Sequence, residues 1–232
     1  DQPRSRGLGD VYKRQLALQP INAFKLDAAI LFSDILTIPD SFGLGVEFVE
    51  KEGPVFNNPI NSSTDISNLD HFDPESLDYV YKAVKNIKNS LSEEIPLIGF
   101  CGSPWTLAAY SIEGRSSKDF KKTLNFLLSN QEDVHNLLTK YTDACFLYLR
   151  RQVQSGADVI QIFDSWASLL SKEGLIEYSF NYINALISAL KLDPVTKNIP
   201  VIVFARNPKC NIEELINTSA DCISLYLSLI HI

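Results

Sequence analysis

Short apolar runs alternate with segments of helical periodicity along most of this chain, and this alternation limits the fold more than any other feature. Between the runs, apolar residues recur at helical spacing, for example in 74–92 and 118–154. Nearly continuous apolar strands that alternate with helices predict a parallel sheet covered by helices. Five runs are interpreted as strands, at residues 26–39, 95–100, 156–170, 201–205 and 220–225.

A TIM-type (β/α)8 barrel fits this pattern best. No GxGxxG follows the first strand and no GxxxxGK[ST] occurs, so neither dinucleotide binding nor P-loop chemistry is indicated. About five βα units fit into the chain, fewer than a closed barrel needs. We therefore predict a truncated α/β barrel, and the lack of any Met also suggests a fragment.

Three segments differ in composition. Residues 1–15 are polar and lack an apolar period, and we interpret them as foreign or disordered. Residues 16–225 are expected to form the partial barrel, which is the catalytic domain. Residues 226–232 are expected to be a second foreign or disordered tail.

The first apolar run, LDAAILFSDILTIP, has Asp27 at its start and one carboxylate, Asp34, in its interior. In a strand, Ile30, Phe32 and Asp34 would share one face. A carboxylate among apolar residues is costly unless it is paired, hydrogen-bonded or faces a polar ligand. Because parallel α/β proteins bind ligands at the carboxyl ends of strands, Asp34 either contacts a ligand or turns the chain after the strand.

Two further strands also end in polar residues. Ser103 is predicted to cap a helix with Pro104 at its first position, and this helix carries Tyr110, whose plain interpretation is aromatic packing. The next strand ends at Asp164 and Ser165, and side-chain alternation leaves open which of them faces inward. No GxSxG surrounds Ser165, which argues against a nucleophilic serine.

Charge and cysteine usage exclude several classes. The net charge is −7 and no basic stripe with aromatic residues occurs, so we expect no nucleic-acid partner. No apolar run is long enough to span a membrane, so we expect a cytoplasmic protein. Cys101, Cys145, Cys210 and Cys222 have no metal-ligand or disulfide spacing and are expected to be buried free thiols. We interpret His135 as a surface or packing residue, and expect no metal site.

Three longer phrases give the chain a resemblance to a known family. FSDILTIPDSFGLGVEFVEKEGPVF, PLIGFCGSPWTLAAYSIEG and GADVIQIFDSWAS closely resemble the uroporphyrinogen decarboxylase family, from about Ala17 to Leu225. The resemblance implies a (β/α)8 barrel that removes CO2 from the four acetate side chains of uroporphyrinogen III, giving coproporphyrinogen III in haem biosynthesis. It also implies no metal or organic cofactor, and a cytoplasmic homodimer whose active-site clefts face each other.

The resemblance also implies roles for particular residues. Asp34 matches an aspartate that binds the pyrrole NH groups and stabilises the cation formed when a pyrrole is protonated. Tyr110 matches a tyrosine that contacts the substrate near that aspartate. Ser165 matches a serine that hydrogen-bonds a substrate carboxylate, and Asp164 is given a supporting role. Apolar residues around the macrocycle match Ile30, Phe32, Phe100 and Phe163.

The sequence departs from the family's pattern at both ends. Its arginine-rich motif, MRQAGRY, which binds substrate carboxylates, is not found in residues 1–15, and its last three βα units would follow Leu225. His231 matches no family motif. We therefore expect the chain alone to be inactive. Two alternatives are a zinc-dependent corrinoid methyltransferase of the same superfamily, whose expected HxC motif is not seen, and a non-catalytic binding protein derived from this barrel.

Overall fold

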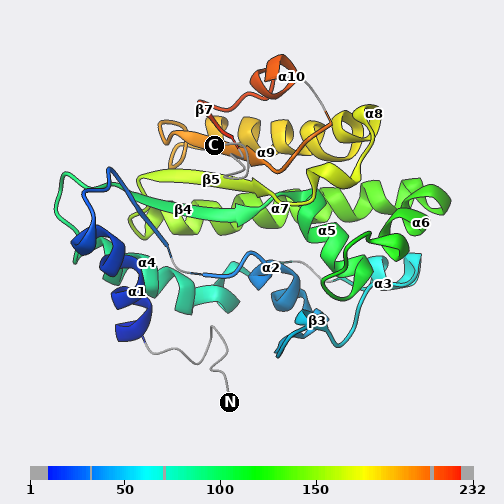
Figure 1. Cartoon of the computed structure of the whole chain (residues 1–232), viewed down its shortest axis with the longest axis horizontal. Helices are drawn as coiled ribbons and strands as arrows, with labels where there is room; N and C mark the ends of the chain where they lie inside the picture. Colours follow the sequence, from blue (N-terminus) through cyan, green and yellow to red (C-terminus); the bar gives the residue numbers. More distant parts are fainter. Residues whose placement is uncertain (1–9, 32, 70–71, 210–211, 226–232) are drawn as a thin grey trace.

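The computed structural model describes residues 10–31, 33–69, 72–209 and 212–225 (Figure 1). A five-stranded sheet runs through it in the order β1-β4-β5-β6-β7, and every neighbouring pair is parallel. The predicted parallel sheet is therefore confirmed, with one strand in each predicted run. The strands are β1 (Ala29–Ile30), β4 (Leu97–Gly102), β5 (Val159–Asp164), β6 (Val201–Ala205) and β7 (Cys222–Ser224).

Helices fill the connections between the strands, as the periodicity predicted. The sequence before the first strand predicts a short helix from Leu16 to Phe24, and the structure shows this helix beginning earlier, at Asp10. The longer helices are α1 (Asp10–Ala23), α4 (Asp78–Lys88), α5 (Pro104–Glu113), α6 (Lys121–Ser129), α7 (Gln131–Gln154) and α9 (Asn181–Leu192). The shorter ones are α2 (Thr37–Pro39), η1 (Asp40–Leu44), α3 (Ser63–Ser67), η2 (Pro74–Leu77), η3 (Ala167–Leu169), α8 (Lys172–Gly174), η4 (Leu175–Phe180) and α10 (Ile212–Ile216).

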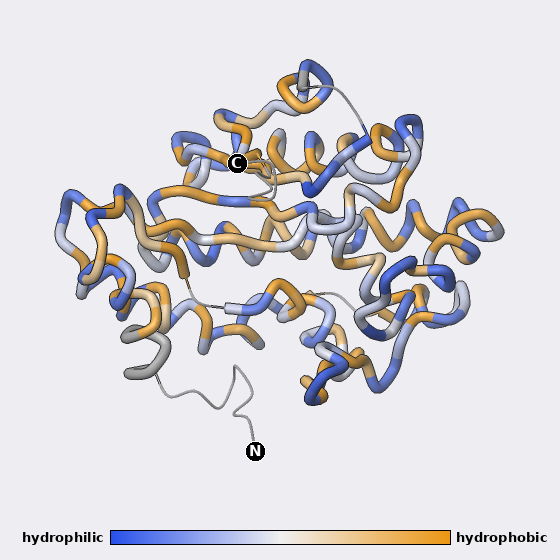
Figure 2. The backbone as a smooth tube through the Cα atoms, viewed as in Figure 1, coloured by the Kyte–Doolittle hydropathy of each residue, from blue (hydrophilic) through white to orange (hydrophobic). Residues whose placement is uncertain are grey.

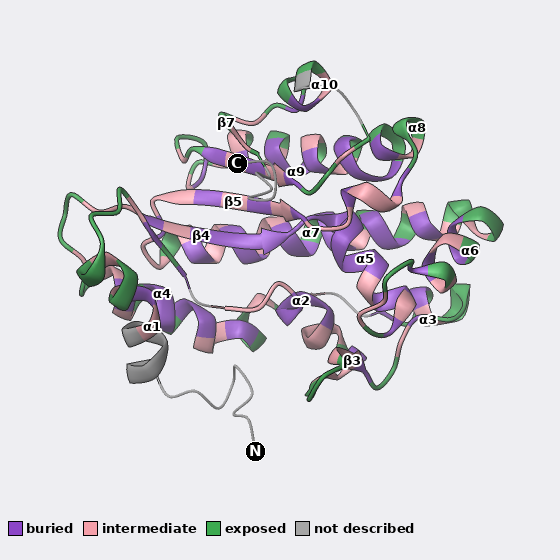
Figure 3. Cartoon of the chain, viewed as in Figure 1, coloured by how far each residue is buried: buried purple, intermediate pink, exposed green. Residues whose placement is uncertain are grey.

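The core lies between one face of the sheet and its helices. In Figure 1, α7 lies behind β4 and β5, and α9 lies next to α7, above β5 in this view; hydrophobic and hydrophilic residues alternate along both helices (Figure 2). On β5 the alternation is complete, because Ile160 and Ile162 have no exposed surface while the residues between them are half-buried. Burying one such side chain contributes about 1.5–3 kcal/mol. Figure 3 shows the same layer as the most buried part of the molecule.

The predicted first strand is much shorter than its apolar run. Only Ala29–Ile30 pair with β4, and the chain then turns into α2. The backbone N–H of Leu36 donates to Oδ1 of Asp34 (2.8 Å), and the Thr37 hydroxyl donates to the Asp34 carbonyl (3.2 Å). Such local bonds compete with strand pairing, which is why the strand ends here. The interpretation of Asp34 as a turn residue is thus correct locally.

The glycines and prolines of residues 40–60 predict a long loop after the first strand, and the structure shows that this prediction is wrong in part. This segment contains an antiparallel hairpin of β2 (Val46–Val49) and β3 (Gly53–Phe56). Its turn uses positive φ angles at Lys51 (69°) and Gly53 (82°), which glycine adopts readily. The hairpin is held against the end of α5 because the Phe56 N–H donates to the Gly114 carbonyl (2.8 Å).

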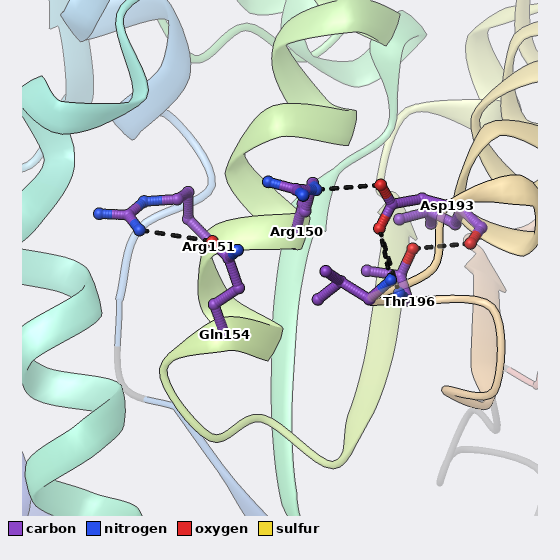
Figure 4. A network of polar contacts seen from close by, with 7 residues as sticks. Arg150, Arg151, Gln154, Asp193 and Thr196 are labelled. Carbon is purple, nitrogen blue, oxygen red and sulfur yellow. Dashed lines mark hydrogen bonds and ion pairs between the residues drawn. The ribbon is translucent and has the colours of Figure 1, made fainter.

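A polar network fixes the outer end of α7 (Figure 4). Arg150 Nε lies 3.0 Å from Oδ2 of Asp193, and the Oδ1 atom of Asp193 accepts from the backbone N–H groups of Val195 (2.9 Å) and Thr196 (3.3 Å). The Thr196 hydroxyl donates to the Leu190 carbonyl (2.6 Å). The turn between α9 and β6 is therefore anchored to α7, which sets where β6 enters the sheet.

Candidate active site

The face of the sheet turned away from α7 carries a row of aromatic side chains. The rings of Phe100 and Phe163 meet edge to face with centroids 5.5 Å apart, and those of Phe163 and Phe204 lie 5.8 Å apart. Both separations are in the favourable range for aromatic pairs. On the adjacent strand Ile30 is 43% exposed. Three of the predicted macrocycle contacts, Ile30, Phe100 and Phe163, thus lie on one apolar surface, and the fourth, Phe32, lies outside the described residues.

Asp34 is half-buried where the chain leaves this surface after β1. Burial raises the pKa of its carboxyl, the hydrogen bond from the Leu36 N–H opposes this, and the nearby charge of Asp40 raises it further. The carboxyl borders a cavity of about 230 Å³ that the β2–β3 hairpin helps to form. Its other lining residues come from or adjoin α2, η1, the hairpin and α4, so this cavity does not include Tyr110 or the aromatic row.

Tyr110 is brought to the same region by α5. This helix begins where the sequence predicted: the Ser103 hydroxyl accepts from the Thr106 N–H (3.0 Å), and Pro104 occupies the first turn. The ring of Tyr110 packs edge to face on Trp166, with centroids 5.7 Å apart. Burial raises the pKa of the phenol, and the charge of Asp34 raises it further. The two side chains therefore act electrostatically on each other.

The end of β5 separates its two polar residues. Asp164 has no exposed surface and points to the helices, where the hydroxyls of Ser103 (3.0 Å), Thr106 (2.9 Å) and Ser179 (2.5 Å) reach its carboxylate. Burial raises the pKa of Asp164, while these hydrogen bonds lower it. Ser165 follows β5 directly, in the turn that also holds Trp166, and is half-buried; continued alternation would put it on the side of Phe163. The structure thus decides the question that the sequence left open.

Sequence reasoning missed two residues of this region. Trp166 contacts the Tyr110 ring, and Arg206 directly follows β6 with an exposed side chain. Arg206 could have been identified from the sequence, because side-chain alternation from Phe204 puts it on the aromatic face of the sheet. Trp166 could not, because it follows the strand in a turn. Among the residues that the structure describes, no three His, Cys, Asp or Glu side chains gather to hold a metal ion.

His135, Cys101 and Cys145 lie as the sequence predicted, whereas Cys222 is exposed, contrary to the prediction of a buried thiol. His135 stacks on Tyr178 (5.0 Å between centroids), and its Nδ1 lies 2.7 Å from the Tyr182 hydroxyl, so it is a packing residue. Cys101 and Cys145 are buried free thiols, Cys222 is free but exposed, and Cys210 lies outside the described residues. No described helix is long and apolar enough to cross a membrane.

These features define an α/β protein of the parallel, barrel-forming type, with a carboxylate, a phenol and an aromatic row gathered at the carboxyl ends of the strands. Comparison with known proteins narrows the class. A model of the uroporphyrinogen decarboxylase (URO-D) family matches residues 14–226. The chain therefore belongs to the uroporphyrinogen decarboxylase family.

Individual relatives agree with this assignment. The chain is 44% identical over 212 residues to the uroporphyrinogen decarboxylase of Acinetobacter baumannii strain SDF and 45% identical to that of Acinetobacter baylyi, covering 91% of this chain in each case. That of Ruthia magnifica is 43% identical. The alignments span only 59–61% of those relatives' lengths.

A solved structure supports the fold. A methyltransferase from Methanosarcina mazei superimposes with a TM-score of 0.72 and 18% identity, over 95% of this chain and 62% of that one. At this identity the likeness shows the fold alone. Together with the family match, it confirms the prediction of a TIM-barrel type of which the chain holds part.

Proposed function

We propose that the protein containing this chain is a uroporphyrinogen decarboxylase, which converts the acetate side chains of uroporphyrinogen III to methyl groups. The observation that carries the proposal is the position of Asp34. Its carboxylate is held by the Leu36 N–H at the end of β1, beside the exposed apolar surface that includes Ile30. This arrangement suits a macrocycle of four pyrroles whose polar NH groups point to its centre.

Asp34 has a direct role in the chemistry proposed. Protonation of a pyrrole gives a cation, the C–C bond to the acetate carboxyl then breaks, and its electrons return to the ring as CO2 leaves. A proton then adds to the exocyclic carbon, which becomes the methyl group, and the proton that the ring took up first is released, so the pyrrole is restored. A carboxylate about 4 Å from the developing cation, at an effective dielectric constant near 20, stabilises it by roughly 4 kcal/mol. The chain's own residues can supply this stabilisation without a metal or organic cofactor.

Tyr110 and Ser165 are assigned to placing the substrate. The phenol of Tyr110 stands on α5 within electrostatic range of Asp34, and the pKa of that phenol is raised by burial, so it acts as a neutral hydrogen-bond donor. Ser165 at the end of β5 is suited to donate to a substrate carboxylate. The apolar surface of Ile30, Phe100 and Phe163 would lie against the macrocycle.

The proposal also covers the pathway, the location and the partners of the longer protein. Haem or related tetrapyrrole biosynthesis, a cytoplasmic location, a homodimer with facing clefts and the absence of nucleic-acid or membrane partners all follow from the family resemblance. The division into a barrel domain at 16–225 with foreign or disordered ends at 1–15 and 226–232 stays a prediction, and α1 begins at Asp10, inside the first of these segments. The likeness to the methyltransferase from Methanosarcina mazei does not favour that activity, because it concerns the fold alone.

The test is to express the longer protein that contains this chain and follow coproporphyrinogen III formation under anaerobic conditions. We expect turnover by the unmodified protein in the presence of a chelator. We expect Asp34→Asn to lower kcat by about a thousandfold, which corresponds to the roughly 4 kcal/mol above. Turnover that persists in Asp34→Asn would exclude the role given to this carboxylate.

A further inference from the structure

A cation, Arg206, directly follows β6, and Ser165 directly follows the neighbouring strand β5. In the β5–β6 register Asp164 pairs with Ala205, and the backbone N–H of Arg206 donates to the Asp164 carbonyl (3.0 Å). Pairing of the two strands therefore continues up to Arg206. Ala205 is 3% exposed and points to the helices, whereas the Arg206 side chain is exposed, as expected for the opposite face.

Side-chain alternation along β5 and β6 indicates which residues share a face of the sheet with Arg206. Phe163 and Phe204 pair across the strands and face the same side, with ring centroids 5.8 Å apart. One step of alternation further along each strand leads to Ser165 on β5 and to Arg206 on β6. The guanidinium therefore belongs to the same end of the aromatic row as the serine assigned to substrate binding.

The charge of Arg206 reaches the rest of the site. It lowers the pKa of the Tyr110 phenol, against the larger raising effect of burial, while the charge of Asp34 raises it. A cation from the end of β6 and an anion from the end of β1 thus act on the same phenol. In a chain with a net charge of −7, a polyanionic ligand needs such a local cation to bind.

We propose that Arg206 binds a carboxylate of the substrate that does not react in the same turnover, and that Ser165 donates a further hydrogen bond to this group. The inference rests on the proposed function, because the ligand is taken to be a tetrapyrrole polycarboxylate. Guanidinium matches carboxylate geometry with two parallel N–H donors. Because a carboxylate that does not react keeps its charge, Arg206 stabilises the bound substrate and the transition state equally, so it sets KM rather than kcat.

The experiment compares four forms of the longer protein that contains this chain: unmodified, Arg206→Gln, Arg206→Lys and Lys209→Gln. Lys209 is a matched control, since it is an exposed cation three residues further along the same loop. We expect Arg206→Gln to raise KM for uroporphyrinogen III about tenfold to a hundredfold, as for loss of a hydrogen bond to a charged group. Its kcat should stay within about threefold, and Arg206→Lys, which keeps the charge but not the paired donors, should fall between. Lys209→Gln should behave as the unmodified protein.

The dependence of KM on ionic strength is a second measurement, and a purely structural role of Arg206 would not change it. Salt screens an exposed ion pair, so added salt should raise KM of the unmodified protein more steeply than that of Arg206→Gln. An unchanged KM in Arg206→Gln, a loss confined to kcat, or an equal effect of Lys209→Gln would each overturn the inference. An unmodified protein without turnover would instead overturn the proposed function and, with it, the inference, so the two failures are distinguishable.

Discussion

Replacement of Asp164 by alanine should destabilise the fold more than replacement of any exposed aspartate. The change leaves the hydroxyls of Ser103, Thr106 and Ser179 facing a space without an acceptor, and all three residues have no exposed surface. A buried donor left unpaired costs about 1–3 kcal/mol. Removing a charge that burial disfavours returns part of this cost, so we expect a net loss of about 3–5 kcal/mol.

Urea unfolding of the longer protein, followed by tryptophan fluorescence, measures this loss. Trp105 and Trp166 both lie at the end of the sheet that Asp164 holds, and Trp105 Nε1 donates to the Trp166 carbonyl (3.0 Å). Asp164→Asn keeps the side-chain volume and one acceptor, so it should lose about 1–2 kcal/mol. Asp143→Ala on the exposed side of α7 is the control and should stay within about 0.5 kcal/mol. An Asp164→Ala protein as stable as this control would refute the reasoning.

The pH dependence gives an independent check. Burial raises the pKa of Asp164 in the folded state above its ordinary value of 3.8, so the folded state favours the protonated form. The stability contributed by this protonation is fully present below the unfolded-state pKa and is lost as pH rises through the folded-state pKa. Asp164→Asn cannot titrate, so its deficit relative to the unmodified protein should shrink as pH rises through that window. A deficit that grows with pH would contradict the direction of the shift.

Three further outcomes are expected from the same structure. Tyr110→Phe and Ser165→Ala should each lower kcat/KM by roughly tenfold, since each removes a neutral hydrogen bond worth about 0.5–1.5 kcal/mol. Steady-state kinetics measures this change. A complete loss of activity in Ser165→Ala would instead require a covalent or proton-transfer role for this serine. Because burial raises the pKa of Asp34, the acid limb of the kcat/KM profile should lie above the ordinary carboxyl value of 3.8 and vanish in Asp34→Asn. The 232-residue chain expressed alone should form no coproporphyrinogen, and product from it would contradict the role given to the arginine-rich motif.

Sequence periodicity predicted the sheet well because its strands coincide with apolar runs that have to be buried. Runs such as VIVFA carry enough apolar surface that any other conformation would leave it in water, and β6 covers just these residues, Val201–Ala205. It failed at Leu26–Pro39, where the run is apolar but Asp34 bonds its own neighbours and ends the strand early. It also failed at the β2–β3 hairpin, where the glycines of Gly43–Gly53 were interpreted as loop signals although Gly53 serves a tight turn between strands.

The residues of the candidate site also differ in how far the sequence could predict them. Asp34 could be found from the sequence, because a carboxylate inside an apolar run needs a reason whatever the fold. Ser165 and Asp164 could be named but not told apart, since alternation gives two faces without saying which one the helices cover. That assignment depends on residues distant in sequence, namely Ser103, Thr106 and Ser179, whose hydroxyls meet only after α5 and η4 have packed against β5.

Asp34 and Asp164 show how position on a strand decides what a carboxylate does. Both follow apolar runs, and burial raises the pKa of both. Asp164 lies on the face covered by helices, where three hydroxyls satisfy it and no ligand can reach. Asp34 receives the Leu36 N–H on one oxygen, remains half-buried, and borders a cavity. A carboxylate kept partly unsatisfied in this way gains most when a cation forms beside it, and such a cation appears only as the substrate is protonated. Aspartate therefore has two roles in this chain: Asp164 fastens the end of β5, and Asp34, which follows β1, supplies the charge for the proposed reaction.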